Sequence, residues 1–335
     1  VQQAYEVLSN PKRRSLYDAT LPPEIKVNKV VSHEFFYSRP NLVKLDEPQL
    51  LYILLEVGSL ESADKIPAPP LNVCLVLDRS TSMQGDKIDM VKSAAVHLIR
   101  SLRPQDVFSV VAFSDRAEVI IPAAINWDQN KQESRIHLMQ PTGATEIFQG
   151  LEAGLKEVRR SLDPSRVNHI ILLTDGHTYG DEQACLTLAE EAARQNIGIT
   201  GMGIGHEWND IFLDALASRT GGSSAYISKP KDIQNILVDK FNALASTFAD
   251  EVSLEFKEQE HVRVNYAFRL QPEGGAIELG NPIRLGPILR DAPLHVLFEV
   301  VVDPLALENE VIILLDGLLK ISVTANPIPL PPIRI

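Results

Sequence analysis

LNVCLVLDRSTS, residues 71–82, is the stretch that decides the fold. The run Leu71–Leu77 is almost wholly apolar and ends abruptly at Asp78, after which Ser80 and Ser82 follow at alternate positions. A short run of this kind, bounded by polar residues, predicts a strand buried on both faces, as in a parallel sheet. The acidic and hydroxyl side chains then follow the carboxyl end of the strand, which is where open α/β sheets bind their ligands.

Downstream of this strand, apolar strand-like runs alternate with helical patterns up to about residue 248. The expected strands are 106–114, 118–122, 168–174, 197–204 and 225–228, and the expected helices are 87–102, 145–161, 181–196, 210–219 and 230–248. Strands that alternate with helices of this length predict an α/β fold with a doubly wound, mostly parallel sheet.

Past Asp250 the pattern changes to strands without intervening helices. The expected strands are 252–256, 262–270, 276–279, 295–302 and 311–323, which indicates an antiparallel β-sandwich. Two earlier strands, 27–36 and 50–57, have no partners in the α/β unit, and we expect them to join this sandwich. The predicted domains are therefore an α/β domain at 70–249, sandwich strands at 21–69 and 250–325, and an extended, proline-rich tail at 326–335.

Composition excludes several classes of function. The chain has 335 residues, a net charge of −12 and a sequence pI near 5.2, which argues against nucleic acid or an anionic membrane as partner. Its two cysteines fit a reducing compartment, and no run is apolar for long enough to span a membrane. We therefore expect a cytoplasmic protein. Because the sequence does not begin with Met, we also expect further sequence upstream of Val1.

Three segments are expected to converge at the carboxyl ends of strands. They carry two carboxylates and three hydroxyls: Asp78, Ser80, Ser82, Thr145 and Asp175. An oxygen-only donor set without His or Cys favours Mg²⁺, with Mn²⁺ or Ca²⁺ as alternatives, over zinc. With few charged ligands, the ion keeps enough positive charge to accept a further carboxylate from another molecule. The alternative is that Asp78 and Asp175 only cap helices or form turns.

These residues resemble the von Willebrand factor A (VWA) family, whose order of elements residues 71–248 follow. The family's metal-ion-dependent adhesion site uses D-x-S-x-S, a later Thr and an Asp after the fourth strand, and Asp78, Ser80, Ser82, Thr145 and Asp175 match all five positions. The glycines of Gly203-Ile204-Gly205-His206 and of Gly221-Gly222 also look like those of bacterial members. The resemblance implies direct or water-mediated metal contacts from the hydroxyls, water-mediated contacts from the carboxylates, and a partner's acidic residue completing the sphere.

Residues 4–18, AYEVLSNPKRRSLYD, resemble the final part of a DnaJ-type J-domain. The His-Pro-Asp tripeptide with which such domains act on a chaperone ATPase is absent from the sequence. We therefore expect residues 1–20 to be the end of a J-domain whose earlier part precedes this sequence.

Other catalytic motifs are absent: the sequence has neither a phosphate-binding G-x-x-x-x-G-K-[ST] nor a G-x-S-x-G nucleophile elbow. His177 and His206 lie near strand ends and are interpreted as surface loop histidines. Arg79 either contacts a partner or shields the metal loop. The sequence thus predicts a non-enzymatic, Mg²⁺-dependent protein-binding module that captures a partner's Asp or Glu, linked to chaperone recruitment. The alternatives are an adaptor subunit of a separate AAA-type ATPase, as in chelatase-like systems, and hydrolysis at the metal, which is disfavoured because no separate general base is evident.

Overall fold

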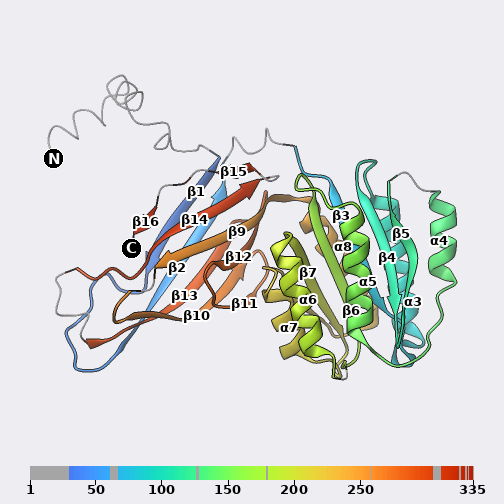
Figure 1. Ribbon diagram of the computed structural model, residues 1–335, viewed down its shortest axis with the longest axis horizontal. Helices are drawn as coiled ribbons and strands as arrows, with labels where there is room; N and C mark the ends of the chain where they lie inside the picture. The colour runs from blue at the N-terminus through green and yellow to red at the C-terminus, as the bar shows by residue number, and fades with distance from the viewer. Residues whose placement is uncertain are drawn as a thin grey trace, which may run out of the picture.

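A computed structural model describes residues 30–60, 67–125, 128–178, 180–257, 259–304, 311–323, 326–328, 330 and 332–334 (Figure 1). Within these residues the chain forms an α/β unit and a β-sandwich, which lie side by side on the right and left of Figure 1. The J-domain-like segment, residues 4–18, lies outside the described residues.

The α/β unit is built on one six-stranded sheet in the order β5-β4-β3-β6-β7-β8. Its strands are β3 (Leu71–Asp78), β4 (Val107–Phe113), β5 (Ala117–Ala124), β6 (Val167–Thr174), β7 (Ile197–Ile204) and β8 (Ser224–Ile227). Only β5 runs antiparallel to its neighbour. Its helices are α3 (Asp86–Ser101), α4 (Gln129–His137), α5 (Ile147–Arg160), α6 (Glu182–Arg194), α7 (Asp210–Ser218) and α8 (Ile233–Ala245), with 3₁₀ turns η3 (Thr81–Met83) and η4 (Pro230–Asp232). The predicted doubly wound sheet is confirmed.

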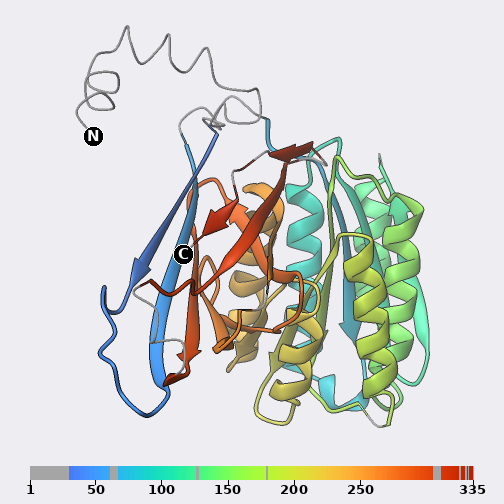
Figure 2. The same ribbon diagram turned by 60° about the vertical axis from the view of Figure 1, so that its left-hand side comes forward.

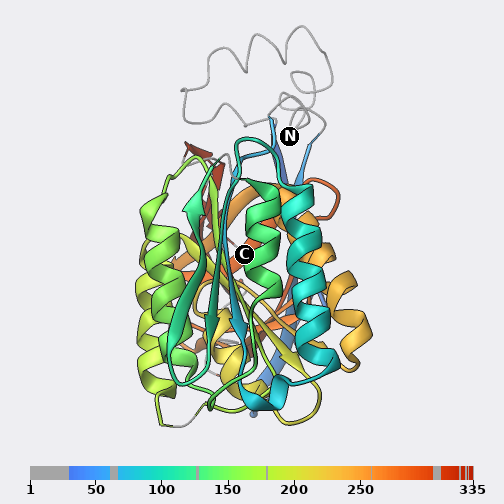
Figure 3. The ribbon, with the colours of Figure 1, turned by 90° about the vertical axis from the view of Figure 1, so that its right-hand side faces the viewer.

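Helices cover both faces of this sheet, as Figure 3 shows with the strands running from top to bottom between them. Every residue of β3, β4 and β6 is buried, which explains why these strands are continuous apolar runs rather than alternating ones. One face packs on α3 and α8, and the other on α5, α6 and α7. Two glycines let α5 approach closely, because a Cβ at Gly150 or Gly154 would lie 2.5 Å from the side chain of Phe113 or Val76.

The β-sandwich is formed by segments from before and after the α/β unit. One sheet has the order β1-β2-β13-β10-β11, and the other has the order β12-β9-β14-β15, with β16 also paired to β14. The strands are β1 (Val31–Tyr37), β2 (Gln49–Ser59), β9 (Thr247–Lys257), β10 (Val262–Gln271), β11 (Gly275–Ile277), β12 (Ile283–Leu289), β13 (Leu294–Val302), β14 (Asp316–Val323), β15 (Asn326–Ile328) and β16 (Ile333–Arg334). Strand β2 pairs antiparallel with β13, so the blue strands of Figure 2 lie beside the orange and red ones. The flanking antiparallel sandwich is thus confirmed.

Some elements differ from the sequence expectation. Helix α4 and strand β12 were not expected, and β14 begins at Asp316 rather than near residue 311. Helix α8 ends at Ala245 and β9 begins at Thr247, so the last helix is shorter and the next strand longer than predicted. Two short strands of the proline-rich segment, β15 and β16, pair with β14 and extend its sheet.

A candidate metal centre at the carboxyl edge of the sheet

The predicted acidic residues meet at one edge of the α/β sheet. Strands β3 and β6 are parallel neighbours with Leu77 opposite Leu173, so Asp78 and Asp175 come at corresponding strand ends. The chain continues from β3 to β4 on one side, and from β6 to β7 on the other, which makes this the topological switch point. We call this edge, at the bottom of the α/β unit in Figures 1 and 3, the carboxyl edge.

Asp78 is fixed by hydrogen bonds to both of its carboxyl oxygens. Oδ1 accepts from the backbone N–H of Ser80 at 2.7 Å, and Oδ2 accepts from Thr174 Oγ1 at 2.6 Å. The side chain is fully buried. Burial raises the pKa of this carboxyl, and the bonds from Thr174 and Ser80 lower it in part. A buried carboxylate compensated only by neutral donors favours a nearby cation.

A chain of oxygens links the two ends of the site. Ser80 Oγ lies 2.9 Å from Ser82 Oγ, and Ser82 Oγ donates to Asp175 Oδ1 at 2.7 Å. Ser80 and Asp175 are buried, whereas Ser82 lies at the surface. Ser82 Oγ therefore links the oxygens of Ser80 and Asp175, and this chain reaches the surface at Ser82.

Thr145 comes from the loop before α5, which is tied to the loop after β3. Thr142 N donates to Arg79 O at 2.8 Å, and Thr81 N donates to Gly143 O at 3.2 Å. Thr145 is buried beside Gly176, where an added Cβ would lie 3.3 Å from Thr145 Oγ1. The structure therefore brings the five sequence-predicted residues to the same place.

Lys87 and Thr174 belong to this site and were missed from the sequence. Lys87 Nζ lies 2.5 Å from Asp175 Oδ2 and 3.3 Å from Ser82 O, while its side chain is 31% exposed. The signals were available: Thr174 directly precedes Asp175, and Lys87 lies in the first turn of the helix that follows Ser82.

Two residues near the site take other roles. Arg79 forms an ion pair with Glu118 of β5, its Nη1 lying 3.0 Å from Glu118 Oε2. His177 is exposed on the loop after β6, as expected of a surface loop histidine.

The donor chemistry of the site fits a hard divalent cation. Among the described residues, no group of three or more His, Cys, Asp and Glu side chains is placed to hold a metal ion. A metal at the carboxyl edge would therefore have to use hydroxyl oxygens beside the two carboxylates. That donor set matches Mg²⁺, Mn²⁺ or Ca²⁺ and excludes the nitrogen and sulfur donors typical of zinc sites.

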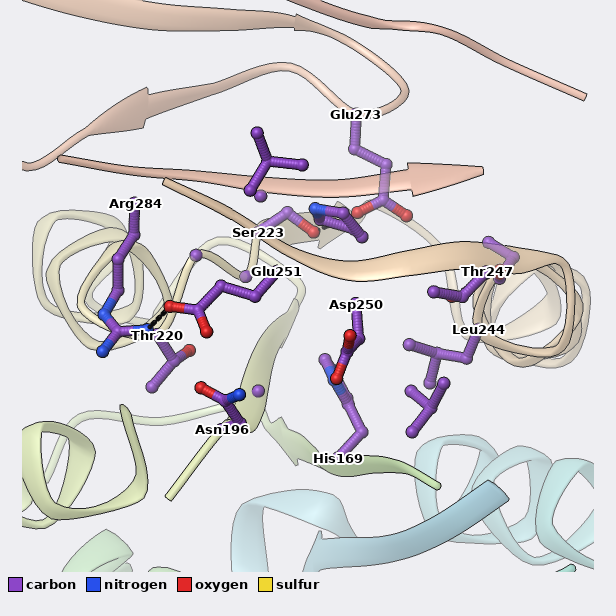
Figure 4. Close-up of a pocket in the computed structure, with 18 of the residues that line it drawn as sticks. His169, Asn196, Thr220, Ser223, Leu244, Thr247, Asp250, Glu251, Glu273 and Arg284 are labelled. Carbon is purple, nitrogen blue, oxygen red and sulfur yellow. Dashed lines mark hydrogen bonds and ion pairs between the residues drawn. The ribbon is translucent and has the colours of Figure 1, made fainter. Parts of the chain in front are cut away.

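A cavity lined by both polar and apolar residues lies at the opposite ends of these strands, where the α/β unit meets the sandwich. It has a volume of about 70 Å³. Figure 4 shows His169, on β6, and Asp250, on β9, both pointing into it. Burial raises the pKa of Asp250 to about 6 and lowers that of His169 to about 3. Arg284 and Glu251 form an ion pair at one side of this cavity, which we call the joint pocket.

Arg269 and Lys240 close the joint pocket with contacts between the two units. Arg269 is buried and donates to the backbone oxygens of Gly221, Gly222, Leu285 and Glu273. Lys240 Nζ, from α8, lies 2.5 Å from Glu273 Oε2. These contacts connect the α/β unit to the sandwich through the hydrogen bonds of Arg269 to backbone oxygens and through the ion pair of Lys240 with Glu273.

A doubly wound sheet with oxygen donors at its switch point defines the class of α/β ligand-binding domains. Residues 72–243, about half of the chain, match the family model of the von Willebrand factor type A domain. The chain belongs to this family. A solved structure, von Willebrand factor type A from Catenulispora acidiphila, has the same fold, with a TM-score of 0.72 at 17% identity over 91% of this chain and 73% of that one.

Curated relatives include bacterial and animal proteins. Uncharacterized protein sll0103 of Synechocystis is 33% identical over 248 residues, which cover 70% of this chain and 58% of that protein. Human inter-alpha-trypsin inhibitor heavy chain H4 is 30% identical over 201 residues, covering 56% of this chain and 21% of that one. The chain thus spans less than two thirds of either relative.

VWA domains are typically metal-dependent protein-interaction modules and are generally not enzymes. They often bind a divalent metal at the adhesion site. No helix in the described part of the chain is long and apolar enough to cross a membrane.

Proposed function

We propose that this chain is a protein-binding module in which Mg²⁺ at the carboxyl edge captures an Asp or Glu of a partner. The observation that carries the proposal is the pair of buried carboxylates, Asp78 and Asp175, held together by hydroxyl groups. Asp78 has both oxygens engaged by neutral donors, and Asp175 accepts from Ser82. Buried carboxylates arranged in this way are compensated best by a cation.

Each residue has a distinct role in this proposal. Ser80, Ser82 and Thr145 supply neutral oxygen donors, while Asp78 and Asp175 supply the negative charge. Two carboxylates only neutralise a divalent ion, and the ammonium group of Lys87 adds a further positive charge beside them. The site therefore retains attraction for an external carboxylate. Because both oxygens of Asp78 are already hydrogen-bonded, the arrangement favours binding over general-base catalysis.

Calorimetric titration with Mg²⁺ and Mn²⁺ tests the metal site directly. We expect saturable binding to the wild type and none to a variant with both Asp78→Ala and Asp175→Ala. Asp239→Ala, which removes an exposed carboxylate on α8, is the matched control and should bind like the wild type. Equal binding by the double variant and the wild type, with circular dichroism showing both folded, would contradict the proposal. A phosphatase screen should also show no Mg²⁺-dependent turnover.

The J-domain-like pattern of residues 4–18 extends this proposal. We infer that the full-length protein couples carboxylate capture to recruitment of a chaperone ATPase in the cytoplasm. The pattern in the sequence is its only support. An assay of chaperone ATPase rate with a protein in which a complete J-domain precedes this chain tests it, and stimulation is the expected result.

The second candidate, an adaptor for a separate AAA-type ATPase, is distinguished by the same kind of assay. Stimulation of such an ATPase on mixing with this chain, and not of a chaperone ATPase, would favour the adaptor function.

A further inference from the structure

An aromatic pair lies on the carboxyl edge beside the candidate metal centre. Thr174, which bonds to Asp78, is opposite Gly203 on β7, and Gly203 is opposite Tyr226 on β8. These residues form a row across parallel strands, and directly opposed residues of a sheet point to the same face. The row leads from the carboxylates of the metal centre towards the edge strand β8.

Trp208 occupies the place that a side chain at Gly203 would take. A Cβ at Gly203 would lie 2.0–2.5 Å from indole ring atoms, so the ring lies directly on the backbone of β7. Trp208 Nε1 donates to Gly205 O at 3.0 Å, which fixes the ring. The Tyr226 ring stacks against it with centroids 6.0 Å apart and an interplanar angle of 24°.

The pair presents aromatic surface to solvent. Tyr226 is 44% exposed, and its hydroxyl lies 2.8 Å from Nδ1 of the exposed His206. We call Trp208, Tyr226 and His206 the aromatic shelf. Ile211, in the first turn of α7, is also exposed and extends the apolar surface of this region.

Charged side chains of both signs lie along the carboxyl edge. Lys87 and Arg79 lie by the candidate metal centre. Glu207 and Asp210, both exposed, lie on the loop that carries Trp208 and at the start of α7. With a divalent ion in place, the metal end gains positive charge, while Glu207 and Asp210 place two carboxylates near the aromatic shelf and the exposed Lys229 and Lys231 follow β8.

Strand spacing sets the distance that a ligand must cover. Neighbouring strands are about 4.8 Å apart, so the row from Asp78 to Tyr226 spans roughly 10–15 Å. An extended peptide covers about 3.3 Å per residue and alternates its side chains between two faces, so side chains four positions apart point to the same side and reach both ends.

We propose that the partner binds the carboxyl edge as an extended segment with an acidic residue on the metal and an Arg or Lys four positions away on the aromatic shelf. The inference rests on the proposed function and names the chemistry of the partner. Aromatic faces attract cations, and the carboxylates of Glu207 and Asp210 reinforce that attraction. The aromatic rings together with these two carboxylates favour a cationic side chain over an apolar one.

A displayed library of random linear peptides, selected on the immobilised chain in Mg²⁺ and eluted with EDTA, tests this. We expect enrichment of Asp or Glu paired with Arg or Lys at the stated separation. In a fluorescence titration of one enriched peptide, replacing its Arg by citrulline should weaken binding about 3- to 10-fold. Enrichment of acidic residues alone, or with an apolar residue, would refute the proposed binding of a cationic side chain at the aromatic shelf. Such a result would leave the proposal of metal capture intact. No Mg²⁺-dependent enrichment of acidic residues would overturn both.

A variant of the aromatic shelf supplies the matched control. Tyr226→Leu combined with Glu207→Gln removes an exposed ring and an exposed charge, so the fold should survive. Its Mg²⁺ affinity by calorimetry should equal that of the wild type, while the preference for Arg over citrulline should disappear. An unchanged preference in this variant would refute the proposal.

Discussion

The carboxyl edge has buried carboxylates and the joint pocket has partly buried ones, and the two regions compensate them differently. At the joint pocket Glu273 meets Lys240, and Glu251 meets Arg284, so these two carboxylates face cations from the chain itself. At the carboxyl edge Asp78 meets only a hydroxyl and a backbone amide. Carboxylates paired with fixed cations hold two units together, whereas carboxylates held by neutral donors remain able to bind a cation from solution.

The ion pair of Lys87 gives the carboxyl edge a contact similar to one in the joint pocket. Its ammonium group contacts Asp175 as Lys240 contacts Glu273, but Lys87 is 31% exposed and Lys240 only 11%. A more exposed, flexible ammonium is displaced more readily by a divalent ion. The difference in exposure therefore separates a replaceable cation from a permanent one.

The largest expected effect on stability comes from a substitution at the joint pocket. Arg269→Met would leave four backbone oxygens without their donor and should lower the free energy of unfolding by about 3–5 kcal/mol. Denaturant titration measures this, and Arg263→Met, at an exposed position on the same strand, is the control with a change under about 0.5 kcal/mol. Equal effects of the two variants would contradict the structural role of Arg269.

Metal binding should stabilise the carboxyl edge by a smaller amount. At a free Mg²⁺ concentration of 100 times its dissociation constant, the free energy of unfolding should rise by about 2.7 kcal/mol. Thermal denaturation with Mg²⁺ and then with excess EDTA measures the gain. Asp175→Asn should abolish it, and a gain of the same size in that variant would argue for metal binding elsewhere.

Lys87→Met sharpens the contrast between replaceable and permanent cations. Removing an ammonium that competes for Asp175 should tighten Mg²⁺ binding about 5- to 30-fold, as expected from a charge interaction of about 1–2 kcal/mol. Calorimetry on this variant and on Lys92→Met, at the next lysine of α3, makes the comparison. Weaker Mg²⁺ binding in Lys87→Met would show that Lys87 supports the metal site rather than competing for it.

The smallest expected effect is on the pH dependence of stability, through Asp250. The pKa of Asp250 is raised from 3.8 to about 6, so the folded state holds this proton more tightly than the unfolded state does. Stability should therefore fall as pH rises from about 4 to 6. The shift sets an upper bound of about 3 kcal/mol, which partial exposure reduces to about 1 kcal/mol. Asp250→Asn should be more stable than the wild type at pH 7 by that amount, and equally stable at pH 4. A difference that does not change with pH would contradict this assignment.

The α/β fold and the convergence of the site could be predicted because they follow from local patterns. Continuous apolar runs identify buried parallel strands, and parallel strands bring their carboxyl ends to one edge. That is why Asp78 and Asp175, almost a hundred residues apart, could be placed together. Whether the five predicted residues bind a metal stays a prediction.

The parts that were missed depend on contacts that the sequence does not encode locally. Helix α4 buries only Ile136, so it has no apolar stripe to reveal it. Strand β12 contains Gly286 and Pro287, which normally indicate a break. Gly286 is required by a distant residue: its φ is 112°, and a Cβ there would lie 2.3 Å from Arg269 Nη1. The joint pocket could not be predicted from the sequence because it depends on contacts between distant residues, and Arg269 contacts residues up to 48 positions away.

The pairing of β2 with β13 has a consequence for how the protein is made. Ser59 and Leu294, which end and begin these strands, are separated by the whole α/β unit. At about 5–20 residues per second, a ribosome needs roughly 10–50 s to deliver β13 after β2 has emerged. During that interval the buried side of β2, with Leu51, Ile53 and Leu55, has no sheet to pack against. The nascent β1–β2 hairpin therefore exposes an apolar face during this interval, and the α/β unit has time to fold before the sandwich closes.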